Sequence, residues 1–283
     1  MTKKIGFIDL FIDEWHANHY PEWIRGSKLA ADFELGYAWE EKTKPGLRPL
    51  DKWCADFGMT PARSQDEVIE NSDCLIVLAP SNPEVHEELS RKALMSGKPT
   101  YMDKPFAPDK AAALRIFDLA RKHNTPMFSS SALRFSDELI ALKNDTFKNE
   151  PIRMVGTTGG GSSYWEYCIH QIEMIVALMG TGATRLMQTV DGLAKHVVIE
   201  YGDGRIGHVT YHPNYGFQLM VSGSDNCAIT PAGNHCFETL LDTILTFFNG
   251  GPNPVPEAET IEIASLVGQS VAAQTKPNVW FEV

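Results

Sequence analysis

The feature that most constrains the fold is an alternation of short apolar segments with amphipathic ones over roughly the first 128 residues. The apolar segments are "KIGFIDL", "FELGYAW", "CLIVLA", "PTYMD" and "TPMFSSS". Between them, apolar residues recur every three or four positions, as in residues 84–97, where Gly97 stands at the expected helix end. Strands that alternate with helices form a parallel sheet with right-handed crossovers. The sequence therefore predicts an α/β fold with a Rossmann-like domain over residues 1–126.

The pattern changes in the second half of the chain. Apolar and polar residues alternate in "RMVGTTGG", "RLMQTVDG", "HVVIEYGDG", "RIGHVTYHP" and "FQLMVSGSDNCAIT", and Gly202–Gly204 separates two of these segments as a hairpin turn would. We therefore expect a C-terminal α+β domain over residues 127–283 with a mostly antiparallel, open sheet. The uncovered face of such a sheet is expected to join subunits into a homodimer or homotetramer.

Composition excludes several classes of partner. The 283 residues include 25 Lys and Arg against 36 Asp and Glu, a net charge of −11, which argues against nucleic acid and anionic membranes. No apolar run approaches the roughly 20 residues that a membrane span requires. Asp9 and Asp13 interrupt the first apolar segment, so we expect a strand there rather than a signal peptide. With five cysteines and no C-x-x-C pair, we expect free thiols and a cytoplasmic protein.

Two strand ends carry residues suited to chemistry. One strand runs into Ala79–Asn82, and the next runs into Asp103–Pro105. The carboxyl ends of parallel strands line a common crevice, so both segments are expected to face it. Pro105 restricts Lys104 to an extended backbone and would hold its amine at the strand end.

This segment resembles the glucose–fructose oxidoreductase/inositol dehydrogenase (Gfo/Idh/MocA) family. The resemblance rests on "CLIVLAPSNPEVH", "GKPTYMDKP", "SSSALRFSDEL" and "SSYWEYCIHQIEMIVALMG", and it is strongest over residues 73–180. It implies an NAD(P)-dependent oxidoreductase that transfers hydride between a nicotinamide cofactor and a sugar, polyol or related hydroxylated small molecule. Lys104 and His170 would handle the hydroxyl proton, and Glu166 and Arg134 would orient the substrate. The cofactor contacts implied are Gly6, Ile8, Asp9, Glu40, Ala79, Pro80, Asn82, His86 and Asp103.

Three of these assignments have structural alternatives. Glu166 and His170 are four residues apart and share a helix face, but Ser163 and Glu166 also form a capping-box pattern. His170 and His86 each have the alternative of a hydrogen-bonded core histidine; the catalytic role is preferred for His170, and the structural role is preferred for His86. Asp103 stands where the family more often has Glu, which shortens its reach.

The first loop departs from the family. Where two or three glycines usually follow the first strand, this chain has "DLFIDEWHANHY". Bulky side chains would crowd the amides that cradle a pyrophosphate, and Asp9, Asp13 and Glu14 add negative charge beside it. After the second strand, Glu40 would favour NAD over NADP by binding ribose hydroxyls and repelling a 2′-phosphate.

Two other functions are therefore considered. A non-redox relative would keep the fold and bind a carbohydrate or a protein partner, or serve as an accessory subunit. A metal-assisted lyase or isomerase would use His16 and His19, which lie beside Asp13 and Glu14. Three-apart histidines without a fixed third ligand are weak support, so no metal ligand is assigned.

Overall fold

A computed structural model describes residues 2–283, which form two compact units. The first contains the chain up to Ala107 together with Ala111–Ser130 and Leu240–Pro256, and the second contains Pro108–Lys110, Ser131–Thr239 and Glu257–Val283. The return of residues 240–256 to the first unit was not expected.

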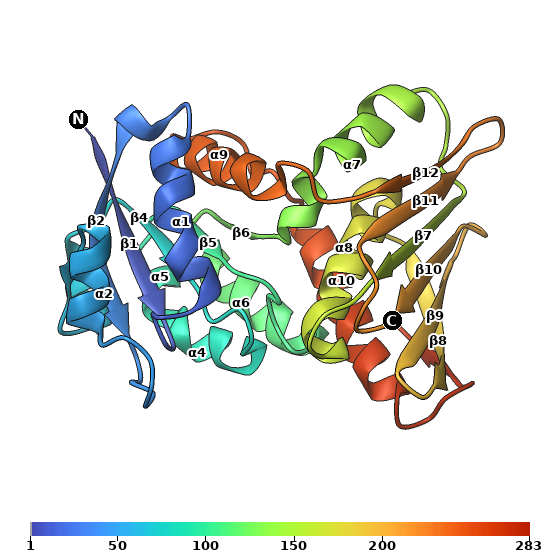
Figure 1. Cartoon of the computed structure of the whole chain (residues 1–283), viewed down its shortest axis with the longest axis horizontal. Coiled ribbons are helices and arrows are strands. Elements are labelled where there is room, and N and C mark those ends of the chain that lie inside the picture. Colours follow the sequence, from blue (N-terminus) through green and yellow to red (C-terminus); the bar gives the residue numbers. More distant parts are fainter. Residues whose placement is uncertain (1) are drawn as a thin grey trace. The chain divides into compact units, whose positions relative to one another are not determined.

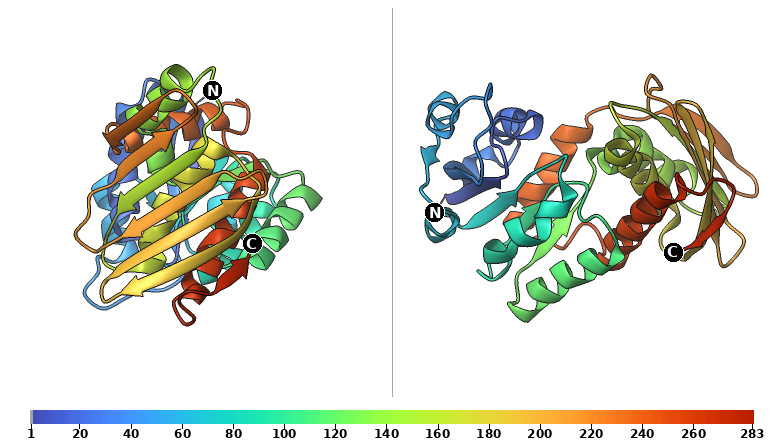
Figure 2. Two further views of the ribbon diagram at one scale, coloured as in Figure 1. Left: turned by 90° about the vertical axis from the view of Figure 1, so that its right-hand side faces the viewer. Right: turned by 90° about the horizontal axis from the view of Figure 1, so that it is seen from below.

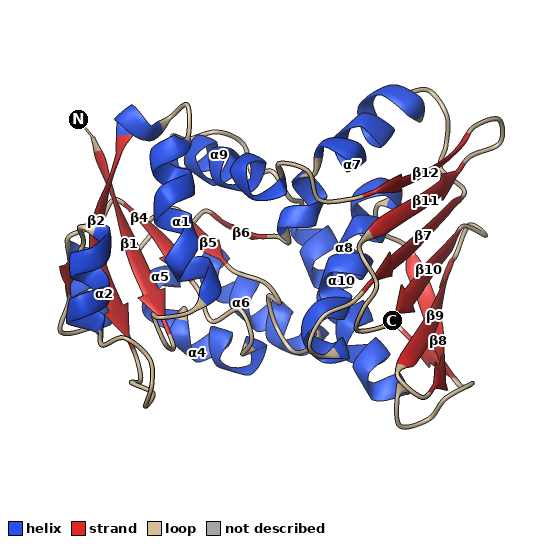
Figure 3. Ribbon diagram, in the orientation of Figure 1, coloured by secondary structure: helices blue, strands red, loops and turns tan. Residues whose placement is uncertain are grey.

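The first unit is built on a six-stranded sheet of order β3-β2-β1-β4-β5-β6 (Figures 1 and 3). Every pairing in it is parallel, as the alternating pattern predicts. Its strands are β1 (Lys3–Asp9), β2 (Phe33–Glu40), β3 (Thr60–Pro61), β4 (Cys74–Val77), β5 (Thr100–Met102) and β6 (Met127–Ser129). Its helices are α1 (Trp15–Gly26), η1 (Ala30–Asp32), α2 (Leu50–Phe57), α3 (Gln65–Glu70), η2 (Pro83–Val85), α4 (His86–Leu89), α5 (Arg91–Leu94) and α6 (Lys110–Lys122), the last of which starts in the second unit.

The central strands are buried on both faces, which explains why they read as continuous apolar runs. Gly6 lies inside β1, where a Cβ atom would collide with the side chains of Val68 and Ser72. Its missing side chain therefore serves close packing on the sheet. The helix expected over residues 84–97 is divided into η2, α4 and α5.

The second unit is built on a seven-stranded sheet of order β12-β11-β7-β10-β9-β8-β13. All its pairings are antiparallel except that of β7 with β10. Its strands are β7 (Met154–Gly159), β8 (Ala183–Asp191), β9 (Ala194–Tyr201), β10 (Ile206–Tyr211), β11 (Gln218–Ser222), β12 (Cys227–Pro231) and β13 (Trp280–Glu282). Its helices are η3 (Ala132–Phe135), α7 (Asp137–Ala141), η4 (Leu142–Thr146), α8 (Tyr164–Met179) and α10 (Glu257–Ala273). Helix α9 (Cys236–Phe248) begins here and continues into the first unit.

Helices cover one face of the second sheet and leave the other uncovered. In the left view of Figure 2 the strands lie in front and α8 and α10 lie behind them. Gln171 of α8 reaches the covered face, where its Nε2 donates to the carbonyl of Thr210 at 2.9 Å. Along β9 and β10, buried residues alternate with half-buried ones, which is the period-2 pattern read from the sequence. Within residues 2–283, no helix is long and apolar enough to cross a membrane.

Candidate active site

The structure brings the two predicted strand ends together in the first unit. Leu75–Val77 of β4 pairs with Thr100–Met102 of β5, so their carboxyl ends meet at one edge. The side chain of Lys104 is buried there, and its Nζ lies 3.4 Å from the carbonyl oxygen of Pro80. Ala79 has a φ of +86°, an unusual backbone conformation for a residue with a side chain. Strained backbone of this kind concentrates at functional sites.

Asp103 is at the centre of a buried polar cluster. Its carboxylate is bonded to Nδ1 of His16, and the hydroxyls of Tyr101 and Tyr20 lie 3.4 and 3.5 Å away. Burial acts to raise the pKa of Asp103, but the neighbouring His16 outweighs it, and the pKa is lowered. Burial and the same carboxylate raise the pKa of Tyr20. Asp103 is thus an anion held within the first unit by side chains of its own chain.

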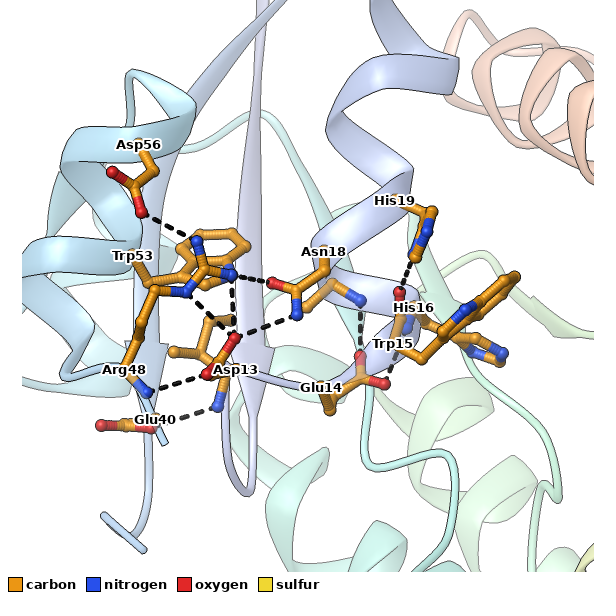
Figure 4. Close-up of polar contacts among 12 residues, drawn as sticks. Asp13, Glu14, Trp15, His16, Asn18, His19, Glu40, Arg48, Trp53 and Asp56 are labelled. Atoms are coloured by element: carbon orange, nitrogen blue, oxygen red, sulfur yellow. Dashed lines mark hydrogen bonds and ion pairs between the residues drawn. The ribbon is translucent and has the colours of Figure 1, made fainter. Parts of the chain in front are cut away.

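The loop between β1 and α1 is fixed by its own carboxylates (Figure 4). Glu14 caps α1, and its side chain accepts from the amides of His16 at 2.8 Å and Ala17 at 2.5 Å. Asp13 accepts from the backbone amide of Arg48 at 2.8 Å and from its guanidinium at 2.8 and 3.1 Å. Burial acts to raise the pKa of Asp13, but the hydrogen bonds and charge of Arg48, together with a hydrogen bond from Asn18, outweigh it, and the pKa is lowered.

The last residues of β1 and β2, Asp9 and Glu40, pair with one another in register. Oδ1 of Asp9 accepts from the amides of Leu10 at 2.6 Å and Phe11 at 3.3 Å. Glu40 accepts from the amide of Ile12 at 3.1 Å. Both carboxylates therefore bind the loop that follows β1.

The second unit places His170 and Glu166 on one face of α8. Nδ1 of His170 lies 2.7 Å from the hydroxyl of Ser131. Glu166 accepts from the hydroxyls of Ser162 at 3.2 Å and Ser163 at 3.3 Å, just before the helix. Glu166 therefore bonds at the start of the helix, where the capping alternative puts it. Its partners there are side-chain hydroxyls rather than backbone amides.

Arg134, predicted to orient the substrate, is buried in an ion-pair cluster of the second unit. Its Nε donates to Glu173 and its Nη1 to Glu259, each at 2.8 Å. Glu173 also accepts from the amide of Ser131 at 2.8 Å. Burial acts to lower the pKa of Arg134, and the two carboxylates more than offset it, so the pKa is raised. The contacts described for its guanidinium are structural.

Other predicted cofactor residues also make contacts inside the first unit. His86 is fully buried, with Nδ1 3.0 Å from the carbonyl of Phe106, and burial lowers its pKa. This is the structural role preferred from the sequence. Asn82 donates to Glu84 at 2.8 Å. Ile8 lies within β1 and is buried. Gly6 lies in the same strand, and neighbouring side chains fill the space beside it.

Comparison with known proteins shows which family this chain resembles. The model of an oxidoreductase family with an NAD-binding Rossmann fold, GFO_IDH_MocA, matches residues 19–130. Inositol 2-dehydrogenase of Agrobacterium fabrum is 25% identical over 258 residues, which are 82% of this chain and 74% of that protein. The chain is similar to members of the Gfo/Idh/MocA family over these residues. The resemblance stated from the sequence is confirmed.

Two further matches define the extent of the likeness. An uncharacterised oxidoreductase of Schizosaccharomyces pombe is 29% identical over 126 residues, which are 44% of this chain, and the match spans 32% of that protein's length. The crystal structure of scyllo-inositol dehydrogenase from Lactobacillus casei shares the fold, with a TM-score of 0.81, 13% identity and coverage of 99% of this chain and 98% of that one.

The matched family model describes an NAD-binding fold, and the first loop allows the fit of a dinucleotide to be tested. The elements that would hold a pyrophosphate are present, because α1 begins just beyond the end of β1. However, the amides of His16 and Ala17 at that helix end are bonded to Glu14. The fit therefore requires that the side chain of Glu14 leave these amides.

The histidines considered for a metal are engaged elsewhere. His16 bonds Asp103, and Nδ1 of His19 lies 2.6 Å from the carbonyl of Trp15, whose ring stacks on His19 at 4.3 Å. Across residues 2–283, no group of three His, Cys, Asp or Glu side chains is arranged to hold a metal ion.

Sequence reasoning missed the actual partners of the charged residues in the loop. Glu14 immediately precedes α1, and that position was a usable signal for a helix cap. Neither the bond between His16 and Asp103 nor the clamp of Arg48 on Asp13 has a local signal, because each joins segments far apart in the chain.

Proposed function

We propose that this protein is an NAD(P)-dependent oxidoreductase that transfers hydride between a nicotinamide cofactor and a sugar, polyol or related hydroxylated small molecule. The observation that carries the proposal is the buried amine of Lys104 at the joint carboxyl edge of β4 and β5. Ligands of open α/β sheets bind at that edge. The match to the oxidoreductase family model and the likeness to an inositol 2-dehydrogenase support the reaction class and the substrate class.

The bound cofactor supplies the hydride chemistry, and the residues of this chain supply the proton chemistry. When an alcohol is oxidised, its hydroxyl proton must be taken up as the hydride leaves carbon. Lys104 is assigned to take up this proton, and its burial keeps bulk water away from the amine. In the second unit, the bond to Ser131 fixes the orientation of His170, which is assigned to hydrogen-bond or exchange a proton with the substrate hydroxyl.

NAD is proposed as the cofactor in preference to NADP. Glu40 ends β2, the strand after which family members select the adenosine ribose. A carboxylate there accepts hydrogen bonds from free ribose hydroxyls and repels a 2′-phosphate. A Glu40→Gln variant should therefore reduce the preference for NADH over NADPH, measured as a ratio of dissociation constants.

A homodimer is proposed through the uncovered face of the second sheet. One cross-strand row on that face runs across all seven strands and is mainly apolar. It consists of Ile229, Met220, Gly156, His208, Val198, Met187 and Trp280. The side chain of Ile229 is 76% exposed, and Met220 lies over Gly156. A continuous apolar face of this kind marks an interface between proteins. The free thiols are in keeping with action in the cytoplasm.

The test combines ligand binding with turnover. The melting temperature is measured with NAD, NADP and their reduced forms, because a ligand that binds only the native state raises it. Lys104→Met should then reduce turnover by about a hundredfold or more and leave the nucleotide-induced shift intact. If no nucleotide raises the melting temperature at millimolar concentration, the proposal fails.

One observation favours a second function, that of a non-redox relative. Glu14 holds the helix-terminal amides that a pyrophosphate would use. A family member that binds a carbohydrate without turnover would have no need to release them. Thermal stabilisation by inositol or a sugar in the absence of any nucleotide effect would support this alternative.

A further inference from the structure

The N-terminal end of α1 already holds an anion, and that anion belongs to the chain. The two carboxylate oxygens of Glu14 accept from separate amides, Oε2 from His16 at 2.8 Å and Oε1 from Ala17 at 2.5 Å. Amides of a helix N-terminus bind phosphate oxygens in the same manner. The carboxylate of Glu14 therefore occupies the position in which a phosphate group would receive these hydrogen bonds.

The loop that carries Glu14 is anchored on both sides. On one side, Asp13 is held by Arg48, which also donates to Asn18 at 2.5 Å. On the other side, the amide of Ile12 donates to Glu40, and the side chain of Ile12 is fully buried. These contacts give Glu14 a defined place (Figure 4).

Asp9 provides a second, independent observation at the same end of β1. Its side chain is 1% exposed, and its Oδ2 has no hydrogen-bond partner among residues 2–283. A buried carboxylate oxygen without a donor is costly. Burial, followed by the charge of Glu14, raises the pKa of Asp9. The two carboxylates are thus close enough to repel one another, and a phosphate bound between β1 and α1 would meet the same repulsion.

We infer that Glu14 is a built-in competitor for the pyrophosphate site, so that a dinucleotide binds only when the Glu14 carboxylate has left the amides of His16 and Ala17. This rests on the proposed function, because it concerns the same cofactor. It makes Glu14 a residue that sets cofactor affinity. Affinity in the wild-type protein is lowered by the free energy needed to break the two bonds of the cap.

The experiment measures the affinity of NADH and of inorganic pyrophosphate for the whole protein by isothermal titration calorimetry. Glu14→Gln removes the charge and keeps one cap oxygen, whereas Glu14→Ala removes both. Two control variants on α3 match these changes away from the loop. Ser64→Ala removes another helix cap, in which Ser64 accepts from the amide of Glu67 at 3.2 Å, and Glu70→Gln removes an exposed charge. Circular dichroism verifies that each variant is folded.

The expected result is that NADH binds Glu14→Ala about tenfold more tightly than wild type, the factor that one helix cap is typically worth. Glu14→Gln should also bind more tightly, and both controls should match wild type. If NADH binds wild type and both folded Glu14 variants equally, or binds the variants more weakly, the inference is overturned. If pyrophosphate binds the variants more tightly and no nucleotide binds any protein, the inference stands and the proposed function fails.

Discussion

Arg134 offers a sharp test, because sequence and structure assign it different roles. The resemblance predicts that it orients the substrate, whereas the structure places it between two carboxylates. Its side chain is 7% exposed, and those of Glu173 and Glu259 are 3% and 15% exposed. We consider the replacement Arg134→Met, which has a similar length and no charge.

The size of the effect follows from burial. Removing one partner of a buried ion pair costs about 3–5 kcal/mol, because it leaves an uncompensated charge in a medium of low polarity. Here Glu173 would still accept a hydrogen bond from the amide of Ser131, but it would lose the compensating charge of Arg134. The exposed pair of Arg185 and Glu200 serves as a control, because its side chains are 42% and 32% exposed. Arg185→Met should cost about 1 kcal/mol or less.

Urea unfolding followed by circular dichroism measures both variants. Arg134→Met is expected to lose about 3–5 kcal/mol in the free energy of unfolding, and the double variant Arg134→Met/Glu173→Met should recover part of it. Activity assays accompany the unfolding curves. If Arg134→Met unfolds within about 1 kcal/mol of wild type and loses kcat/KM, the structural role is refuted and the role in substrate binding is restored.

Four further predictions follow from the described contacts. The pKa of Asp9 is raised in the folded state, first by burial, so its contribution to the unfolding free energy is fully present below the ordinary pKa of 3.8 and is lost as pH rises through the folded pKa. Asp9→Asn should reduce the pH dependence of the unfolding free energy. In urea titrations at pH 8, the unfolding free energy of this variant should exceed that of wild type. Ala79→Gly should stabilise the protein by about 1 kcal/mol because glycine tolerates a φ of +86°, and an unchanged or lower unfolding midpoint would contradict this. Val198→Glu should convert a dimer into monomers in light scattering, whereas the exposed Lys148→Glu should not. In labelling with a thiol reagent, Cys227 should react first, since the other four cysteines are buried, and equal rates for all five would refute this.

The parts of the site that depend on local pattern could be predicted from the sequence. Strands β4 and β5 are short apolar runs, and the parallel arrangement brings their carboxyl ends together, so Pro80 and Lys104 were expected at one edge. The hairpin at Gly202–Gly204 was likewise expected from its turn residues.

The parts that depend on distant partners could not be predicted. Arg134 bonds Glu259 across 125 positions of sequence, and no periodicity identifies such a pair. The apolar residues of α9 indicate a buried helix, but they do not tell which unit it joins, and most of it packs in the first. The acidic residues of the first loop signalled a poor pyrophosphate site. That Glu14 occupies the helix amides depends on the three-dimensional path of the loop.

The two outermost strands of the second sheet, β12 and β13, limit how copies of this chain can associate. Proline at position 231 has no amide hydrogen to offer, and the opposite border is a strand of only three residues, Trp280–Glu282. A strand of a second copy therefore has few backbone groups to pair with along β12 or β13. Continuous fibrils formed by strand addition are disfavoured. In the proposed homodimer, contact through the broad surface would use the same patch on both copies, so a pair would close on itself and growth would stop at two for that surface.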